Sequence, residues 1–141
     1  MSRLRLGLEM DGSSRGRQVR DIVQGLARVS AVRGALLVAP DGFVIAAEVP
    51  RAVALEPLAA LAATLGRDLE VGAGRIGRGA FQAAMFSADD GTLFLAASRI
   101  GFVVALADPQ GNVAAIRSAL EEAVTTIDSA WGPTERPAST T

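Results

Sequence analysis

The chain contains no cysteine, histidine, tyrosine or lysine, and all fourteen of its basic residues are arginine. Without cysteine and histidine there is no thiol nucleophile, no imidazole base and no ordinary zinc site. Without lysine there is neither a Schiff base nor the lysine of a phosphate-binding P-loop. These absences exclude most common catalytic centres, and we expect neither a cofactor nor a metal ion.

Serine and carboxylate chemistry remain as catalytic options, and the sequence gives them little support. A serine nucleophile needs a base, and the chain has no histidine to serve as one. The adjacent acidic pairs are Asp89-Asp90, before a glycine turn, and Glu121-Glu122, on the polar side of a predicted helix. Solvated surface carboxylates are the simpler interpretation of both pairs. We therefore expect a protein that is not an enzyme.

The overall composition indicates one folded domain with a protein partner. Half of the residues are apolar, which excludes a disordered chain, and the net charge is −1. A nucleic-acid partner would favour a basic stripe with aromatic platforms, and neither is present. No apolar run reaches the roughly 18 residues of a membrane span. We expect a soluble, cytoplasmic protein without direct membrane insertion.

Both ends of the chain differ in character from the central part. In residues 1–16, Leu4, Leu6, Leu8 and Met10 alternate with polar residues or glycine. This arm is either a strand that adds to a sheet edge or a disordered start. Residues 17–131 form the predicted domain. Residues 132–141 are polar and contain proline, so we expect a disordered tail.

Periodicity predicts three helices and five strands within the domain. The helices are expected at about Arg17–Val29, Leu55–Val71 and Val113–Trp131, and the strands at Gly34–Ala39, Phe43–Val49, Phe81–Ser87, Thr92–Ser98 and Phe102–Ala107. The last three strands lack polar residues at every second position. Because a sheet with one wet face would show that alternation, we expect helices on both faces.

The loop Gly72–Gly77 reads G-x-G-x-x-G, which is the spacing of a dinucleotide-binding loop. In such a loop a strand comes before the glycines and a helix after them. Here a predicted helix comes before and a predicted strand after. The glycines are therefore interpreted as a helix stop and a flexible connection.

The helix predicted at Leu55–Val71 has two distinct faces. Its core face is expected to consist of Leu55, Leu58, Leu61, Ala62, Leu65 and Leu69. Its other face carries Glu56, Ala59, Ala60, Ala63, Arg67 and Glu70, and alanines permit close backbone approach by a second helix. Two copies crossing antiparallel would pair Glu56 of each with Arg67 of the other. Alternatively, alanine is present because it is the best helix former.

The order of these elements over residues 17–131 resembles the Roadblock/dynein-light-chain family, in particular its bacterial MglB-like branch. The runs Ala35–Ala46 and Phe102–Pro109 carry the resemblance. It implies a profilin-like α/β (α+β) three-layer sandwich with a five-stranded antiparallel sheet in the order 2-1-5-4-3. The first and last helices would lie on one face and the central helix on the other.

The resemblance also implies a function. Family members pair through the central helix and the third strand, which here means the Glu56–Glu70 face with Phe81, Ala83 and Met85. The MglB-like branch binds a small Ras-like GTPase and stimulates GTP hydrolysis without a nucleotide site of its own. Arg67, Arg75 and Arg78 are candidate GTPase contacts, although the family is not characterised by an arginine finger.

Two other functions remain open at this point. One is a non-catalytic adaptor or scaffold subunit of a signalling or motility complex. The other is a small-ligand sensor, which would require a deep pocket.

Overall fold

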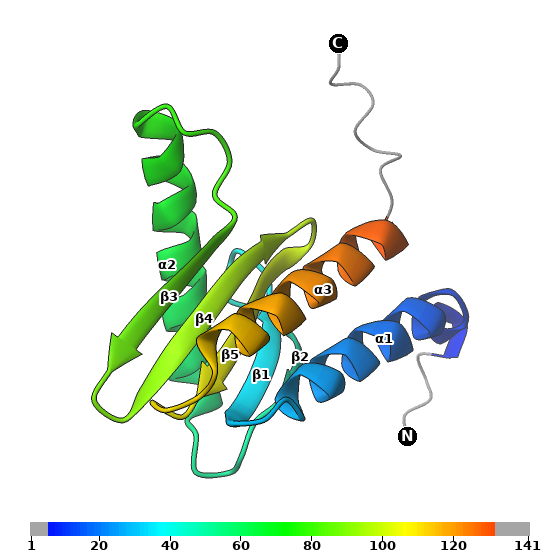
Figure 1. Ribbon diagram of the computed structural model, residues 1–141. Coiled ribbons are helices and arrows are strands. Elements are labelled where there is room, and N and C mark those ends of the chain that lie inside the picture. The colour runs from blue at the N-terminus through cyan, green and yellow to red at the C-terminus, as the bar shows by residue number, and fades with distance from the viewer. Residues whose placement is uncertain (1–5, 132–141) are drawn as a thin grey trace.

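The computed structural model describes residues 6–131, with side chains from residue 14 onward, and is shown in Figure 1. The chain order is α1 (Leu6–Ala27), β1 (Val32–Val38), β2 (Val44–Glu48), α2 (Leu55–Arg75), β3 (Ala83–Ala88), β4 (Gly91–Ser98), β5 (Gly101–Ala107) and α3 (Val113–Trp131). No helix among these residues is long and apolar enough to cross a membrane.

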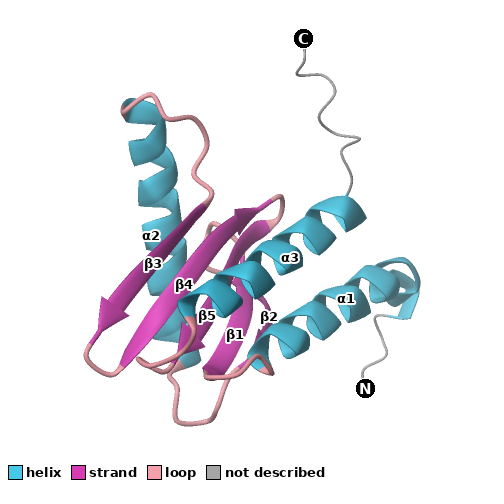
Figure 2. Ribbon diagram, in the orientation of Figure 1, coloured by secondary structure: helices cyan, strands magenta, loops and turns pink. Residues whose placement is uncertain are grey.

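The five strands form one antiparallel sheet in the order β2-β1-β5-β4-β3. α1 and α3 lie on one face of this sheet and α2 lies on the other (Figure 2). The predicted strand order and the three-layer arrangement are confirmed. Because β2 and β3 are the outer strands, each has one side that pairs with no other strand of the described chain.

Two apolar cores hold the layers together, one on each face of the sheet. Leu37, Phe94 and Val103 point toward α1 and α3, while Leu36, Leu95 and Val104 point toward α2. Neighbouring residues along one strand therefore enter different cores, as the pleat of a strand requires. This explains why the central strands carry apolar residues at successive positions.

The first helix is longer than predicted. α1 begins at Leu6 rather than at Arg17, so a strand or a disordered arm is the wrong description of Leu6–Gly16. Local period-two alternation does not decide the structure there, and α1 lies beside α3 along the sheet. The guanidinium carbon of Arg15 lies 5.4 Å from the centre of the Trp131 ring. Residues 1–5 and the predicted tail at 132–141 lie outside the described residues.

Candidate protein-binding surface

The alanine-rich face of α2 packs on its own sheet. Ala59, Ala62 and Ala63 are buried in the core between α2 and the strands. A Cβ atom added at Gly66 would lie 2.5 Å from ring carbons of Phe102 on β5. These small side chains do allow the backbone of α2 to lie close to a neighbouring element, but that element is the sheet of the same chain and not a second helix. The expectation that Ala59 and Ala63 contact a second copy is therefore wrong.

One leucine predicted for the core face of α2 is exposed, and two of its neighbours on the helix are only partly buried. Leu61 is 45% exposed, although it is large and apolar. Leu58 and Leu65 are only partly buried against the core. The spacing of three and then four residues places these three side chains in one row. We refer to Leu58, Leu61 and Leu65 as the leucine stripe.

The charged residues predicted for the dimer contact are exposed, and one of them has a partner within the chain. Glu56, Ala60 and Glu70 are exposed along α2. Arg67 is exposed too, but its Nη1 donates a hydrogen bond to the carbonyl oxygen of Pro40 in the β1–β2 turn. Arg67 therefore fastens this turn to α2, so a Glu56–Arg67 pair between two copies would have to compete with that bond.

The outer strand β3 is apolar on both of its faces. Ala83 and Met85 lie opposite Ala96 and Phe94 of β4, so they share the sheet face covered by α1 and α3. Phe86 lies opposite Leu93, on the α2 face, and is 52% exposed. An outer strand with exposed apolar side chains and free backbone groups is a ready site for pairing with another chain.

The third strand begins later than predicted. β3 starts at Ala83, so Phe81 lies before the strand. Its side chain is partly buried against the core on the α2 face. Phe81 thus lies near the proposed interface but does not belong to the free strand edge.

The C-terminal end of α2 projects beyond the sheet (Figure 1). Val71 and Ile76 are exposed there, the latter at 72%, although both are large and apolar. Arg75 and Arg78 are exposed at the same end, without an ion pair to any residue whose side chain is described. This end offers apolar contact area together with two arginines.

The glycine pattern Gly72–Gly77 does not have the surroundings of a dinucleotide site. Gly72 and Gly74 lie inside the last turns of α2, which ends at Arg75, and β3 follows. The helix-before, strand-after order is as predicted, but Gly72 and Gly74 do not stop the helix, which continues to Arg75. No helix begins at these glycines, so the loop lacks the N-terminal amide groups that receive a pyrophosphate.

A second short motif has no catalytic surroundings either. Residues 12–16 read G-x-S-x-G with Ser14 at the centre, but they lie inside α1. A nucleophile elbow is instead a sharp turn from a strand into a helix. Within the described part of the chain, no three acidic side chains lie close enough together to hold a metal ion.

Comparison with known proteins identifies the family. The sequence model of the Roadblock/LC7 domain family matches residues 18–108. The chain belongs to the Roadblock/LC7 family. The match spans β1 to β5 together with residues 18–27 of α1, and so includes α2 and β3, the elements that carry the leucine stripe and the free strand edge.

Solved structures of other Roadblock proteins share the fold. MglB of Myxococcus xanthus superimposes with a TM-score of 0.76 at 15% identity, covering 82% of this chain and 89% of that one. A Roadblock/LC7 domain from Streptomyces avermitilis gives 0.72 at 21% identity, covering 79% and 96%. An uncharacterized protein of Methanocaldococcus jannaschii is 28% identical over 102 residues, which is 72% of this chain and 90% of that protein.

Proposed function

We propose that this Roadblock protein forms a homodimer through α2 and β3, and that the dimer binds a small Ras-like GTPase and stimulates its GTP hydrolysis. The observation that carries the proposal is the apolar surface left open by the leucine stripe and Phe86. Phe86 lies on the α2 face of β3, whose outer edge has no partner in the described chain, and the leucine stripe lies on the helix that covers this face. Exposed apolar groups that cluster in this way mark protein interfaces.

A twofold arrangement accounts for both features together. If β3 pairs with β3 of a second copy, the sheet continues across the dimer and the unpaired backbone groups of both edges are satisfied. α2 of each copy then lies on the same face of the continuous sheet. The leucine stripe and Phe86 supply side-chain contacts between the copies, in place of Ala59 and Ala63.

The proposed dimer presents two α2 helices on one face as a platform for the GTPase. The protein carries no histidine, cysteine or lysine, so it offers the reaction no imidazole base, thiol nucleophile or lysine amine. Binding of the switch regions would stabilise the hydrolytic arrangement of the GTPase's own residues. Arg75 is the last residue of α2 and Arg78 follows three residues later, both exposed, which supports a contact with an acidic surface of the GTPase.

Binding assays with purified Ras-like GTPases from the same genome test this proposal. Each GTPase is loaded either with GDP or with a non-hydrolysable GTP analogue and is titrated with the dimer. We expect one GTPase to bind at least about tenfold more tightly in the GTP form, because a regulator must distinguish the two switch conformations. Equal affinity for both forms would instead indicate the adaptor function, and no binding by any GTPase would contradict the proposal.

A further inference from the structure

A groove runs between α3 and β3, on the face of the sheet opposite α2. Its volume is about 550 Å³. β4 and the start of β3 form its floor, where Met85 and Phe94 are the large apolar side chains. α3 forms its wall along the positions from Val113 to Asp128, a length of about 22 Å at 1.5 Å per residue. Such an elongated, open shape suits a peptide segment better than a compact ligand.

The wall of the groove combines an apolar row with a charged rim. Leu120 and Val124 point to the floor, and Val113 lies exposed at one end. Arg117, Glu121 and Asp128 line the same side of α3. Asp128 also accepts a hydrogen bond of 2.8 Å from the backbone N–H of Arg99, at the β4–β5 turn. One arginine and two carboxylates leave the wall with a net charge of −1.

The proposed dimer joins two such grooves, and this step rests on the proposed function. Pairing of β3 with β3 of the second copy places the grooves on either side of the twofold axis. α3 packs over β4 and β5 and leaves β3 uncovered. The twofold axis passes midway between the two β3 strands, and neighbouring strands lie about 4.8 Å apart. The axis of α3, above the space between β4 and β5, then lies about 10 Å from the twofold axis, and the two α3 helices lie about 19 Å apart.

This separation determines what fits between the two helices. Packed helices lie about 8–10 Å apart, so a gap of about 19 Å holds one further helix in contact with both walls. The floor is mainly apolar, each inner wall presents Leu120 and Val124 beside the polar Thr125, and the two rims together carry a net charge of −2. We propose that this trough binds one basic amphipathic helix of a partner protein, with its apolar side on β3 and its basic residues near Glu121 of both copies.

An 18-residue synthetic peptide is the probe for this proposal. It carries leucines at helical spacing, flanked by lysines, and a scrambled peptide of the same composition is its control. Calorimetric titration gives the affinity and the number of peptides per chain. We expect saturation at one peptide per two chains, because a helix on the twofold axis blocks a second one. The scrambled peptide should bind at least about tenfold more weakly, because it presents no continuous apolar side.

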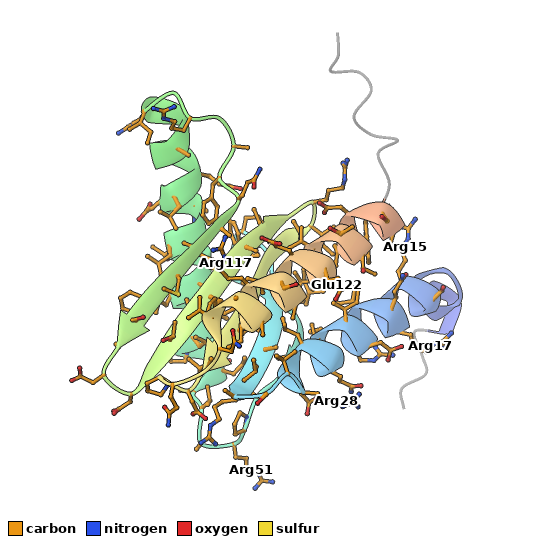
Figure 3. The ribbon with its side chains drawn as sticks, viewed as in Figure 1. Arg15, Arg17, Arg28, Arg51, Arg117 and Glu122 are labelled. Carbon is orange, nitrogen blue, oxygen red and sulfur yellow. The ribbon has the colours of Figure 1, made fainter. Side chains whose placement is uncertain are left out.

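Two charge reversals on α3 provide a matched pair of variants. Glu121 borders the groove, whereas its neighbour Glu122 is exposed and does not line it. Figure 3 shows Arg117 on the groove side of α3 and Glu122 away from it. Glu121→Arg should weaken peptide binding by about tenfold, because it reverses the charge on both walls of the trough. Glu122→Arg should change the affinity by less than about twofold.

The outcomes distinguish this inference from the proposed function. Sedimentation of the protein alone reports whether it is a dimer, independently of the peptide. A dimer that fails to bind the peptide, binds both peptides equally, or loses the same affinity in both variants would overturn the inference while leaving the proposed dimer intact. Saturation at one peptide per chain would overturn the trough geometry, and a monomeric protein would contradict the proposed function itself.

Discussion

Gly66 and Gly72 lie in the same helix but in opposite surroundings, and substituting each with alanine tests how α2 is oriented. A Cβ atom at Gly66 would lie 2.5 Å from ring carbons of Phe102, whereas nothing lies within 4 Å of one at Gly72. Ordinary contact between such carbons begins at about 3.5 Å. The Phe102 side chain is fully buried, so it has little room to move away.

The two substitutions should therefore change stability in opposite directions. Replacing glycine by alanine inside a helix gains about 0.5–1 kcal/mol. Gly72→Ala should gain an amount in this range or somewhat less, because it lies near the helix end. Gly66→Ala gains the same helix propensity but adds an overpacking cost of about 1–3 kcal/mol, so the net change should be a loss of up to about 2 kcal/mol.

Unfolding by guanidinium chloride measures the change in stability of each variant. All samples have the same protein concentration, because the unfolding midpoint of a dimer depends on concentration. Trp131 is the only tryptophan, so its fluorescence reports the end of α3 without a second signal. Far-ultraviolet circular dichroism provides an independent probe of the helices. Equal stabilisation by Gly66→Ala and Gly72→Ala would show that Gly66 does not face Phe102, and our orientation of α2 would be wrong.

Three further substitutions test individual contacts. Leu61→Arg should convert the dimer to monomers in sedimentation experiments, because it places two charges in an apolar contact. Glu122→Arg is the control. If the Leu61→Arg variant stays dimeric, the leucine stripe is not part of the interface. Arg67→Ala should lower the free energy of unfolding by about 1 kcal/mol, because the hydrogen bond to Pro40 is lost, and the protein should stay dimeric. A monomeric Arg67→Ala variant would show that Arg67 contacts the second copy instead. Arg15→Ala should cost about 0.5–1 kcal/mol and change the Trp131 emission spectrum, and an unchanged spectrum would argue against the Arg15–Trp131 contact.

The architecture could be predicted from the sequence because its signals are local and repeated. Apolar residues at successive positions of β4 and β5 require cover on both faces, and the structure provides it. Gly42 occupies the predicted hairpin turn at a φ of 94°, where glycine is favoured. The resemblance then supplied the strand order, which periodicity alone does not contain.

The orientation of α2 could not be obtained from periodicity, because its leucines and its alanines form two apolar rows on different parts of the helix surface. Large leucines were expected to face the core, and small alanines to face a partner. The structure reverses this in part: Ala59, Ala63 and Gly66 are buried and Leu61 is exposed, whereas Leu55, Leu58, Leu65 and Leu69 pack against the core as predicted. Gly66 is the residue in the sequence that could have indicated the correct orientation. It continues the row of small residues on α2, and the absence of a side chain there lets the helix lie against the ring of Phe102.

The start of α1 was missed for a different reason. Its first eleven residues include Gly7, Gly12 and Gly16, which are poor helix formers, and their apolar residues alternate. α1 lies beside α3, which is distant in the sequence, and a local pattern does not record such a neighbour. The groove between α3 and β3 is likewise a product of tertiary packing, so no local pattern along the chain indicated it.

Single-turnover GTP hydrolysis by the cognate Ras-like GTPase, with and without this protein, is the most direct test of the central claim. The wild-type dimer should accelerate hydrolysis by at least about tenfold, whereas Leu61→Arg monomers should produce little acceleration at equal chain concentration. A GTPase that binds the dimer but hydrolyses GTP at its unassisted rate would contradict a role in stimulating hydrolysis. Full acceleration by the monomeric variant would show that the paired surface is not what acts on the GTPase.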